Sequence, residues 1–473
     1  MQESANLARS SVSSVKNREA GEAAALVDAN DSKAVRQVIF RLAGPALVEM
    51  VLINITQMLN MIMVGRVGAE AVAAVGLTTQ PFLLLLSLFM ALNIGTTVIV
   101  ARSVGAGRLD DANRAAGQAL LLNAIFAILV SAVSTHYAEG LLLLMGATPD
   151  VLAEGLQYAH IIYLSTGLTM ITTAMTAILR GAGDTRTPMK INVVANLLVL
   201  LIGYPLIYGF AGLPKWGITG AATATIIAQS VSVVWVMRVL LSGKFAVRIA
   251  LAHVFKWDRP IIARIVKIGF PTSLEQVIMR VGMLIFVKVA ASLGTIALAS
   301  TQIAFNIFGM TFMPGMAFSI AASTLVGQAL GAGKPQLAEQ YGWQVRKFGM
   351  WVAGAMGVAF IACAPYIMML YTTDSEIIDR GVVALRIMGL IQISQATQFI
   401  LGGALRGAGD TRFPLYSTLI GVWGFRVLLS LLFVYVFKWD VAGLWVAAAA
   451  DQCIRSVFIY LRFKKGIWKQ VKV

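Results

Sequence analysis

The chain has 473 residues, of which 58% are hydrophobic and only 13% are charged. Soluble proteins carry about a quarter charged residues, so this composition excludes an ordinary water-soluble globular protein. The mean hydropathy of +0.79 indicates a protein that lies largely within a membrane. Cys363 and Cys453 are the only cysteines of the sequence, so neither a disulfide framework nor a cysteine-rich metal site is expected.

In chain order, residues 1–38 form a polar segment without the apolar core of a signal peptide, and a flexible cytoplasmic arm is expected there, with a short helix around 18–27. From about residue 40 onward, apolar runs of about twenty residues recur, the length that a helix needs to cross a bilayer core. The runs are long and do not alternate between apolar and polar residues, which excludes strands. Twelve spans are predicted, at about 42–64, 76–100, 115–137, 156–179, 190–211, 216–240, 263–291, 297–325, 344–370, 382–405, 414–437 and 440–461.

The basic residues that give the chain its net charge of +16 are distributed according to the predicted topology. Most basic residues fall in the even-numbered connections and the tails, whereas the odd-numbered connections hold only Arg66, Lys215, Arg380 and Lys438. This alternation is the positive-inside pattern, with both termini in the cytoplasm and an even number of spans. We therefore interpret the basic excess as membrane orientation, and no nucleic acid partner is expected.

The sequence repeats itself once, with an offset of 226 residues. The segment Arg-Gly-Ala-Gly-Asp-Thr-Arg at 180–186 recurs unchanged at 406–412. The same offset relates further pairs, namely Pro188 and Pro414, 105–108 and 331–334, Pro45 and Pro271, Glu49 and Glu275, and Gly217 and Gly443. One offset that holds from the first span to the last indicates a duplication without net insertion.

The predicted domains follow from this duplication. They are the arm at 1–38, an N-lobe at 39–240, a cytoplasmic linker at 241–262, a C-lobe at 263–462 and a basic cytoplasmic tail at 463–473. Six spans is an even number, so the lobes are parallel repeats about an axis along the membrane normal. The predicted fold is an all-α membrane protein with twelve transmembrane helices in two pseudo-twofold-related six-helix bundles, which rock about a central cleft.

Ionisable residues within spans are costly unless they face protein or water, so each one is a candidate functional residue. Glu49 begins a polar stripe on the first span, with Thr56, Gln57 and Asn60 on the same side and Asn54 beside them. This face is a plausible lining for a cation route. The alternative is that these polar groups bond to neighbouring helices.

Glu275 is the preferred coupling residue. It follows Pro271, and Met279 and Met283 lie toward its side of the helix. A carboxylate in a partly apolar cleft can take and release a proton near neutral pH and can also attract a cationic substrate. Competition between ion and substrate for this one acid would suffice for antiport. The alternative is a structural ion pair of Glu275 with Arg280 or with a lysine.

Other charged and adaptable side chains complete the candidate site. Asp451 and Arg455 are four residues apart on one helix, which favours an intrahelical structural pair that Arg426 could join. Met and aromatic side chains suit a polyspecific cavity, although ordinary helix packing is the favoured interpretation for any single one of them. The candidate cavity residues are Met279, Met283, Phe305, Gln392 and Gln395, beside Phe308, Phe312 and Gln398.

The two repeated Arg-Gly-Ala-Gly-Asp-Thr-Arg segments end the fourth and tenth spans and are interpreted as structural gate elements. Gly permits the turn, Asp184 and Asp410 can cap the following helix, and Arg180 and Arg406 can face headgroups or a neighbouring carboxylate. They lack the Gly-Lys-Ser/Thr ending of a phosphate-binding loop. Transport energy is therefore expected from a gradient of H⁺ or Na⁺, with no other cofactor and no bound metal.

These features resemble the multidrug and toxic compound extrusion (MATE) family over about residues 38–463. The resemblance rests on the paired gate segments, on Ile62-Met63-Val64-Gly65, on Pro271 with Glu275-Gln276, and on the Asp451 to Arg455 pattern. Within the family the chain is most similar to the bacterial branch of DNA-damage-inducible protein F. The resemblance implies a V-shaped cleft and antiport of drugs, driven by protons or sodium.

Two positions depart from the family pattern. Many members carry an aspartate where this chain has Asn60, which cannot titrate. In other branches the seventh-helix glutamate lies nearer Met279, so Glu275 corresponds to it in role only.

The expected function is efflux of organic cations or hydrophobic drugs by a monomer in the bacterial inner membrane. One alternative is a flippase for lipid-linked or polyprenyl-linked substrates, for which Arg280, Lys288 and Arg426 would meet pyrophosphate. Another is a membrane enzyme, which the sequence disfavours because His136, His160 and His253 are scattered.

Overall fold

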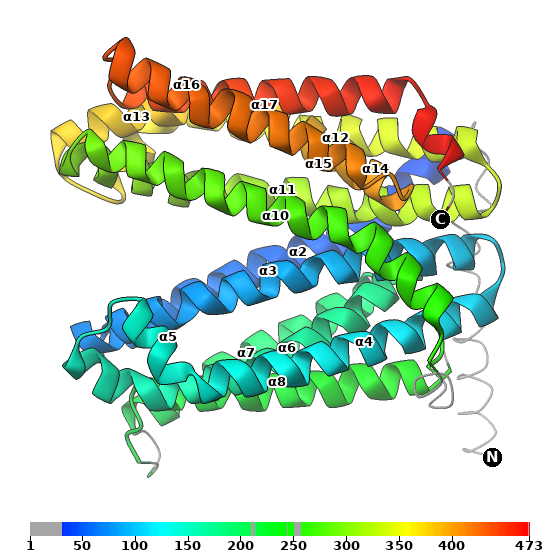
Figure 1. The fold of residues 1–473 in the computed structure, drawn as a ribbon, viewed down its shortest axis with the longest axis horizontal. Helices are drawn as coiled ribbons and strands as arrows, with labels where there is room; N and C mark the ends of the chain where they lie inside the picture. Colours follow the sequence, from blue (N-terminus) through cyan, green and yellow to red (C-terminus); the bar gives the residue numbers. More distant parts are fainter. Residues whose placement is uncertain (1–30, 210–211, 213, 244, 250–256, 472) are drawn as a thin grey trace. The chain divides into compact units, whose positions relative to one another are not determined.

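The computed structural model describes residues 31–209, 212, 214–243, 245–249, 257–471 and 473, and within these residues it is built from helices without β-strands (Figure 1). The chain divides into two compact units. Among the described residues, unit 1 covers Gly44–Gly269, and unit 2 covers Phe270–Val473 together with the described part of Val27–Ala43. Both divisions between the units fall inside a helix. One lies between Ala43 and Gly44, just before Pro45, and the other lies between Gly269 and Phe270, just before Pro271.

The helices up to the linker are α2 (Ser32–Gly65), α3 (Ala69–Gly105), α4 (Leu109–His136), α5 (Ala138–Leu144), α6 (Pro149–Gly181), α7 (Arg186–Tyr208) and α8 (Ile218–Leu241). The helices after it are α10 (Arg259–Ser292), α11 (Thr295–Gly331), α12 (Pro335–Met369), α13 (Ser375–Leu390), α14 (Gln392–Gly407), α15 (Arg412–Leu419), η2 (Ile420–Val427), α16 (Leu428–Leu431), η3 (Leu432–Val436), α17 (Val441–Lys464) and η4 (Ile467–Gln470).

Each of the twelve predicted spans overlaps helical structure in the described residues, and the all-helical fold is confirmed. Ten helices of the described chain are individually long and apolar enough to cross a membrane. The other two predicted spans do not meet this criterion, and each has a physical reason. Helix α10 is 34 residues long but carries several charges, and the predicted span at 382–405 is divided at Ile391 into α13 and α14, of 16 residues each.

The beginning of the first helix lies earlier than predicted. Helix α2 starts at Ser32, inside the segment expected to be a flexible arm, where the Asp31 carboxylate accepts hydrogen bonds from the amides of Lys33 and Ala34. This is the bonding of a helix N-cap, so the sequence supplies its own start signal at Asp31. The short helix expected around 18–27 lies outside the described residues.

The eleventh span contains two π-helical stretches, η2 and η3. π-helical turns are rare and occur mostly as short segments at functional sites. At Gly421, in η2, an added Cβ would overlap the side chains of Asp451 and Arg455 from α17. The widened turn and the missing side chain together make room for two charged groups beside η2.

Glycine also sets the approach between helices of the repeated motif. An added Cβ at Gly407 would overlap the backbone of Ser323 on α11, and one at Gly181 would lie 2.8 Å from the Thr97 carbonyl oxygen on α3. Gly407 and Gly181 are related by the repeat offset, and so are Ser323 and Thr97. The same close crossing therefore occurs in each unit.

We expect Gly407→Ala to destabilise unit 2 by about 1–3 kcal/mol, because the methyl group forces two backbones apart. Gly354→Ala on α12 is the matched control, since its added Cβ meets nothing within 4 Å. Alanine there should raise stability slightly through helix propensity. Thermal unfolding of the purified variants in detergent measures the difference, and equal midpoints for the two variants would contradict the close crossing.

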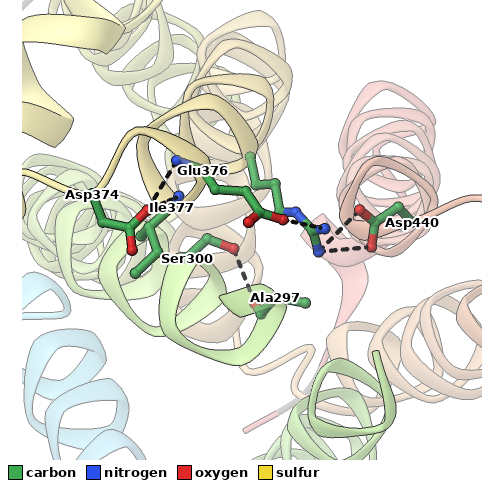
Figure 2. Close-up of polar contacts among 7 residues, drawn as sticks. Ala297, Ser300, Asp374, Glu376, Ile377 and Asp440 are labelled. Atoms are coloured by element: carbon green, nitrogen blue, oxygen red, sulfur yellow. Dashed lines mark hydrogen bonds and ion pairs between the residues drawn. The ribbon is translucent and has the colours of Figure 1, made fainter. Parts of the chain in front are cut away.

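The start of α13 is held by local polar contacts (Figure 2). The Asp374 carboxylate accepts from the amides of Glu376 and Ile377, at 2.9 and 3.3 Å, and so caps the helix. Arg380 bridges Glu376 on its own helix, at 2.9 Å, and Asp440 before α17, at 3.1 Å. These exposed pairs join α13 to the start of α17 within unit 2.

Candidate functional site

Glu49 is buried in unit 1 and is held by two partners. Arg180 Nη2, at the end of α6, and Asn192 Nδ2, on α7, both donate to Glu49 Oε1, the second at 2.7 Å. The other carboxylate oxygen, Oε2, is buried without a hydrogen-bond partner among the described residues. Glu49 thus joins the first helix of the lobe to its fourth and fifth, and one oxygen of the acid remains available.

Glu275 is buried in unit 2 with the equivalent partners. Arg406 Nη2, at the end of α14, donates to both carboxylate oxygens at 2.8 and 3.0 Å, and Thr418 Oγ1, on α15, donates to Oε1 at 3.1 Å. Each of these three residues lies 226 positions after its counterpart in unit 1. We call these two clusters the N-clamp (Glu49, Arg180, Asn192) and the C-clamp (Glu275, Arg406, Thr418).

The clamps assign a role to the repeated gate segments. Their first arginine was expected to face either headgroups or a carboxylate, and in both units it binds the glutamate of the first helix of that lobe. Glu275 does form an ion pair, as the structural alternative held, but the predicted partners Arg280 and lysine are wrong because the partner in the structure is Arg406. The acid is only 5% exposed, so the ion pair lies in the interior of unit 2.

The two aspartates of the gate segments, Asp184 and Asp410, accept hydrogen bonds from different kinds of donor. Asp184 Oδ1 accepts from the amides of Arg186 and Thr187, at 3.0 and 3.1 Å, which confirms the predicted cap of the following helix. Asp410 instead accepts from Arg462 Nε at 2.8 Å, which ties the gate segment of unit 2 to α17. The following basic tail is also packed, since Trp468 is fully buried.

Beside the C-clamp lies a second buried charge cluster. Asp451 pairs with Arg455 four residues along α17, at 2.8 Å, and with Arg426 of η2 at 2.6 Å. The predicted intrahelical pair and the participation of Arg426 are therefore confirmed. Arg455 also donates to Met279 Sδ at 3.3 Å, so this candidate cavity residue contacts the charge cluster.

The remaining candidates are spread over several environments. Thr56 is buried and Asn60 half-buried, whereas Gln57 lies on the exposed side of α2, so the polar residues do not form one uniform stripe. Phe305 packs against Phe286 and Trp445, with ring centroids 5.3 and 4.9 Å apart, as a core residue does. Met283 is half-buried.

Gln392 and Gln395 line a small pocket inside unit 2, beside Thr311, Pro314 and Phe399. Thr311 Oγ1 donates to Gln395 Oε1 at 3.3 Å. The amide nitrogens of both glutamines are buried without an acceptor among the described residues. With two unpaired donors in an otherwise mostly apolar lining, the pocket has the character of a site for one bound water.

All five basic residues of α10 are exposed. Arg280 and Lys288 lie in its second half, and no ion pair joins them to a carboxylate of the described residues. Arg386 on α13 is also exposed and lies inside a predicted span, and the sequence interpretation did not name it among the charged residues of the spans. No group of three His, Cys, Asp or Glu residues that could hold a metal ion occurs in the described chain.

Comparison with known proteins identifies the family. The family model described as MatE matches residues 45–205 and again residues 271–432, which are the two repeats. A probable multidrug resistance protein NorM of Thermotoga maritima is 31% identical over 445 residues, covering 92% of this chain and 94% of that protein. The chain belongs to the MATE family.

A further relative and two solved structures are less similar in sequence. The multidrug resistance protein PmpM of Pseudomonas aeruginosa is 27% identical over 398 residues, with 82% of this chain and 81% of that protein covered. Among solved structures, a MATE crystal structure in the bent conformation has a TM-score of 0.85 at 23% identity, covering 91% of this chain and 95% of that one. A MOP superfamily transporter from Pyrococcus furiosus has a TM-score of 0.84 at 22% identity.

Membership in the MATE family confirms several predictions. The chain has the MATE fold, is a multi-pass membrane transporter, and is not an enzyme. The closer resemblance to the branch of DNA-damage-inducible protein F stays a prediction.

Proposed function

We propose that this MATE transporter exports organic, mostly cationic compounds from the bacterial cytoplasm by proton- or sodium-coupled antiport with alternating access. Relatives over nearly the whole chain are named as multidrug resistance proteins, which supports drug efflux. Those relatives give no support to a flippase. The positive-inside pattern supports placement in the inner membrane with both termini in the cytoplasm.

The observation that carries the proposal is the duplicated clamp. An acid buried in a membrane protein is costly unless it is paired, and here each lobe pairs one in the same way. A proton or a sodium ion that binds the glutamate neutralises the carboxylate charge, and that charge is what holds the arginine. Because Arg180 and Arg406 end the fourth helix of their lobes, release of the arginine frees that helix end from the first helix.

Glu49 Oε2, which accepts no hydrogen bond among the described residues, is the atom to which an ion can bind first. A proton can bind Oε2 before Arg180 leaves Oε1, so exchange does not need to pass through an unpaired buried carboxylate. The alternation of the clamps between closed and released states then gives each lobe two arrangements. Ion binding and substrate binding both bias that equilibrium, as antiport requires.

Purified protein in proteoliposomes tests this function. We expect inward-facing gradients of H⁺ or Na⁺, imposed one at a time, to drive movement of ethidium against its concentration gradient, and ATP to have no effect. Protein-free liposomes are the control for leakage of the dye. If neither ion gradient changes the rate of ethidium movement, the antiport proposal is wrong.

A further inference from the structure

The small pocket of unit 2 stands where unit 1 is filled by apolar side chains. We call the pocket lined by Gln392 and Gln395 the amide pocket. Two of its wall residues are small, Gly315 and Ala396, and the residues 226 positions earlier are Phe89 and Met170. In unit 1 those two side chains are buried and belong to one hydrophobic cluster. Unit 2 therefore lacks the two large side chains that fill this place in unit 1.

The same comparison of the repeats shows that polar donors were added to the pocket wall. Gln392 and Gln395 stand where unit 1 has Thr166 and Thr169. Both threonine hydroxyls donate to carbonyl oxygens of their own helix, at 2.9 and 3.1 Å. Each glutamine is only 2% exposed, and its Nε2 has no acceptor among the described residues. An unpaired buried donor is costly, so the pocket requires a ligand that accepts hydrogen bonds.

The tenth span is broken beside this pocket. Helix α14 begins at Gln392, and no side chain caps it at Ile391. In unit 1 the repeat counterpart, α6, runs without a break over Pro149–Gly181. The N-terminus of a helix carries partial positive charge, and the half-helices of membrane transporters direct such ends toward anionic groups. The first turn of α14, which holds both glutamines, therefore favours an anion in the amide pocket.

Positive charge near the pocket is not balanced by acids. Arg346, half-buried on α12, donates from Nε to Thr397 Oγ1 on α14 at 3.1 Å, and no ion pair joins it to a carboxylate of the described residues. On α17, which packs against α14, Asp451 pairs with both Arg426 and Arg455, so this buried group has one cation in excess. Cations nearby offset part of the cost of burying an anion.

We propose that the amide pocket binds a halide ion, chloride in the cell, with the Nε2 groups of Gln392 and Gln395 as donors. An anion accepts both hydrogen bonds and brings no hydrogens of its own, whereas a water molecule would need acceptors in a mostly apolar wall. The room suits a monatomic ion, and the flexible side chain of Met356 in the wall adapts to its size. This inference does not rest on the efflux function.

Thermal unfolding of the purified full-length protein in detergent tests the site without any transport. The protein is compared in potassium bromide, potassium chloride and potassium gluconate at one ionic strength, since gluconate is too large for the pocket. We expect both halides to raise the unfolding midpoint by about 2 °C or more relative to gluconate, because the ion binds only the folded protein.

Variants separate the pocket from general salt effects. Gln392→Leu/Gln395→Leu removes the donors and should abolish the halide difference. Ala396→Met restores the residue of unit 1 and should abolish it by filling the pocket, so the proposal stays testable if the double variant fails to fold. Gln344→Leu, at a half-buried glutamine of α12 outside the pocket, is the control and should keep the difference.

Crystals grown in bromide locate the ion by its anomalous scattering, and we expect a peak between the two Nε2 atoms. The same midpoint in all three salts for the wild type would overturn the proposal. A halide difference that persists in both pocket variants would show an adventitious ion only and would also overturn it. An ordered water in the pocket without a bromide peak would have the same consequence.

Discussion

Asp451→Asn is expected to lower the free energy of unfolding by about 3–5 kcal/mol, the usual result of removing one partner from a buried ion pair. The carboxylate is fully buried and is the shared partner of Arg426 and Arg455, which are themselves buried. Asparagine keeps the size of the side chain but leaves two cations without their anion. The apparent melting temperature in detergent, followed by tryptophan fluorescence, measures the change.

Glu376→Gln is the matched control for this variant. Glu376 also pairs with an arginine four residues along its helix, but this pair is exposed. Exposed pairs contribute little to stability, so the control should unfold close to the wild type. A melting temperature for Asp451→Asn that equals that of Glu376→Gln would show that the buried cluster is not an energetic unit.

Glu275→Gln is expected to reduce gradient-driven export at least tenfold while the protein stays folded. Glutamine can still accept from Thr418, but it can neither hold Arg406 as an ion pair nor take up a proton or bind sodium by charge. Substrate exchange in the absence of a gradient does not require that ion step, so it should be retained. Initial rates in proteoliposomes, under a proton gradient and separately under a sodium gradient, measure the loss.

Glu49→Gln tests whether the two clamps act alike, because it makes the same change in unit 1. Glu339→Gln is the control, since it removes a partly exposed carboxylate that pairs with Lys469. We expect both clamp variants to lose coupling and the control to keep it. Normal rates for Glu275→Gln under both gradients would refute the assignment of that residue to coupling.

Much of this architecture was predictable because it is local or repeated. The twelve spans follow from the length of apolar runs, and the pair of Asp451 and Arg455 follows from a spacing of four residues on one helix. The duplication follows from a single offset. Glutamate and arginine are 131 residues apart in both clamps because both residues are shifted by the same offset.

The partner of Glu275 could not be predicted from spacing alone. A separation of 131 residues places no constraint on contact, and only the packing of α10, α14 and α15 decides that Arg406 rather than Arg280 reaches the acid. Sequence proximity favoured Arg280, which the helix directs outward. The break between α13 and α14 at Ile391 was not predicted for a similar reason. It accompanies the close contact of α12 with the end of α13 at Gly357 and Gly389, and no proline marks the site in the sequence.

The central claim is that the coupling ion binds at the clamp glutamates and that ion binding and cargo binding favour opposite arrangements of the clamps. Its most direct test is ion displacement from purified protein, measured with a pH indicator for protons and with ²²Na⁺ for sodium, as ethidium is added. We predict that wild-type protein releases one of these ions when ethidium binds, and that the double variant Glu49→Gln/Glu275→Gln binds ethidium without releasing either. Undiminished release from the double variant would contradict the claim.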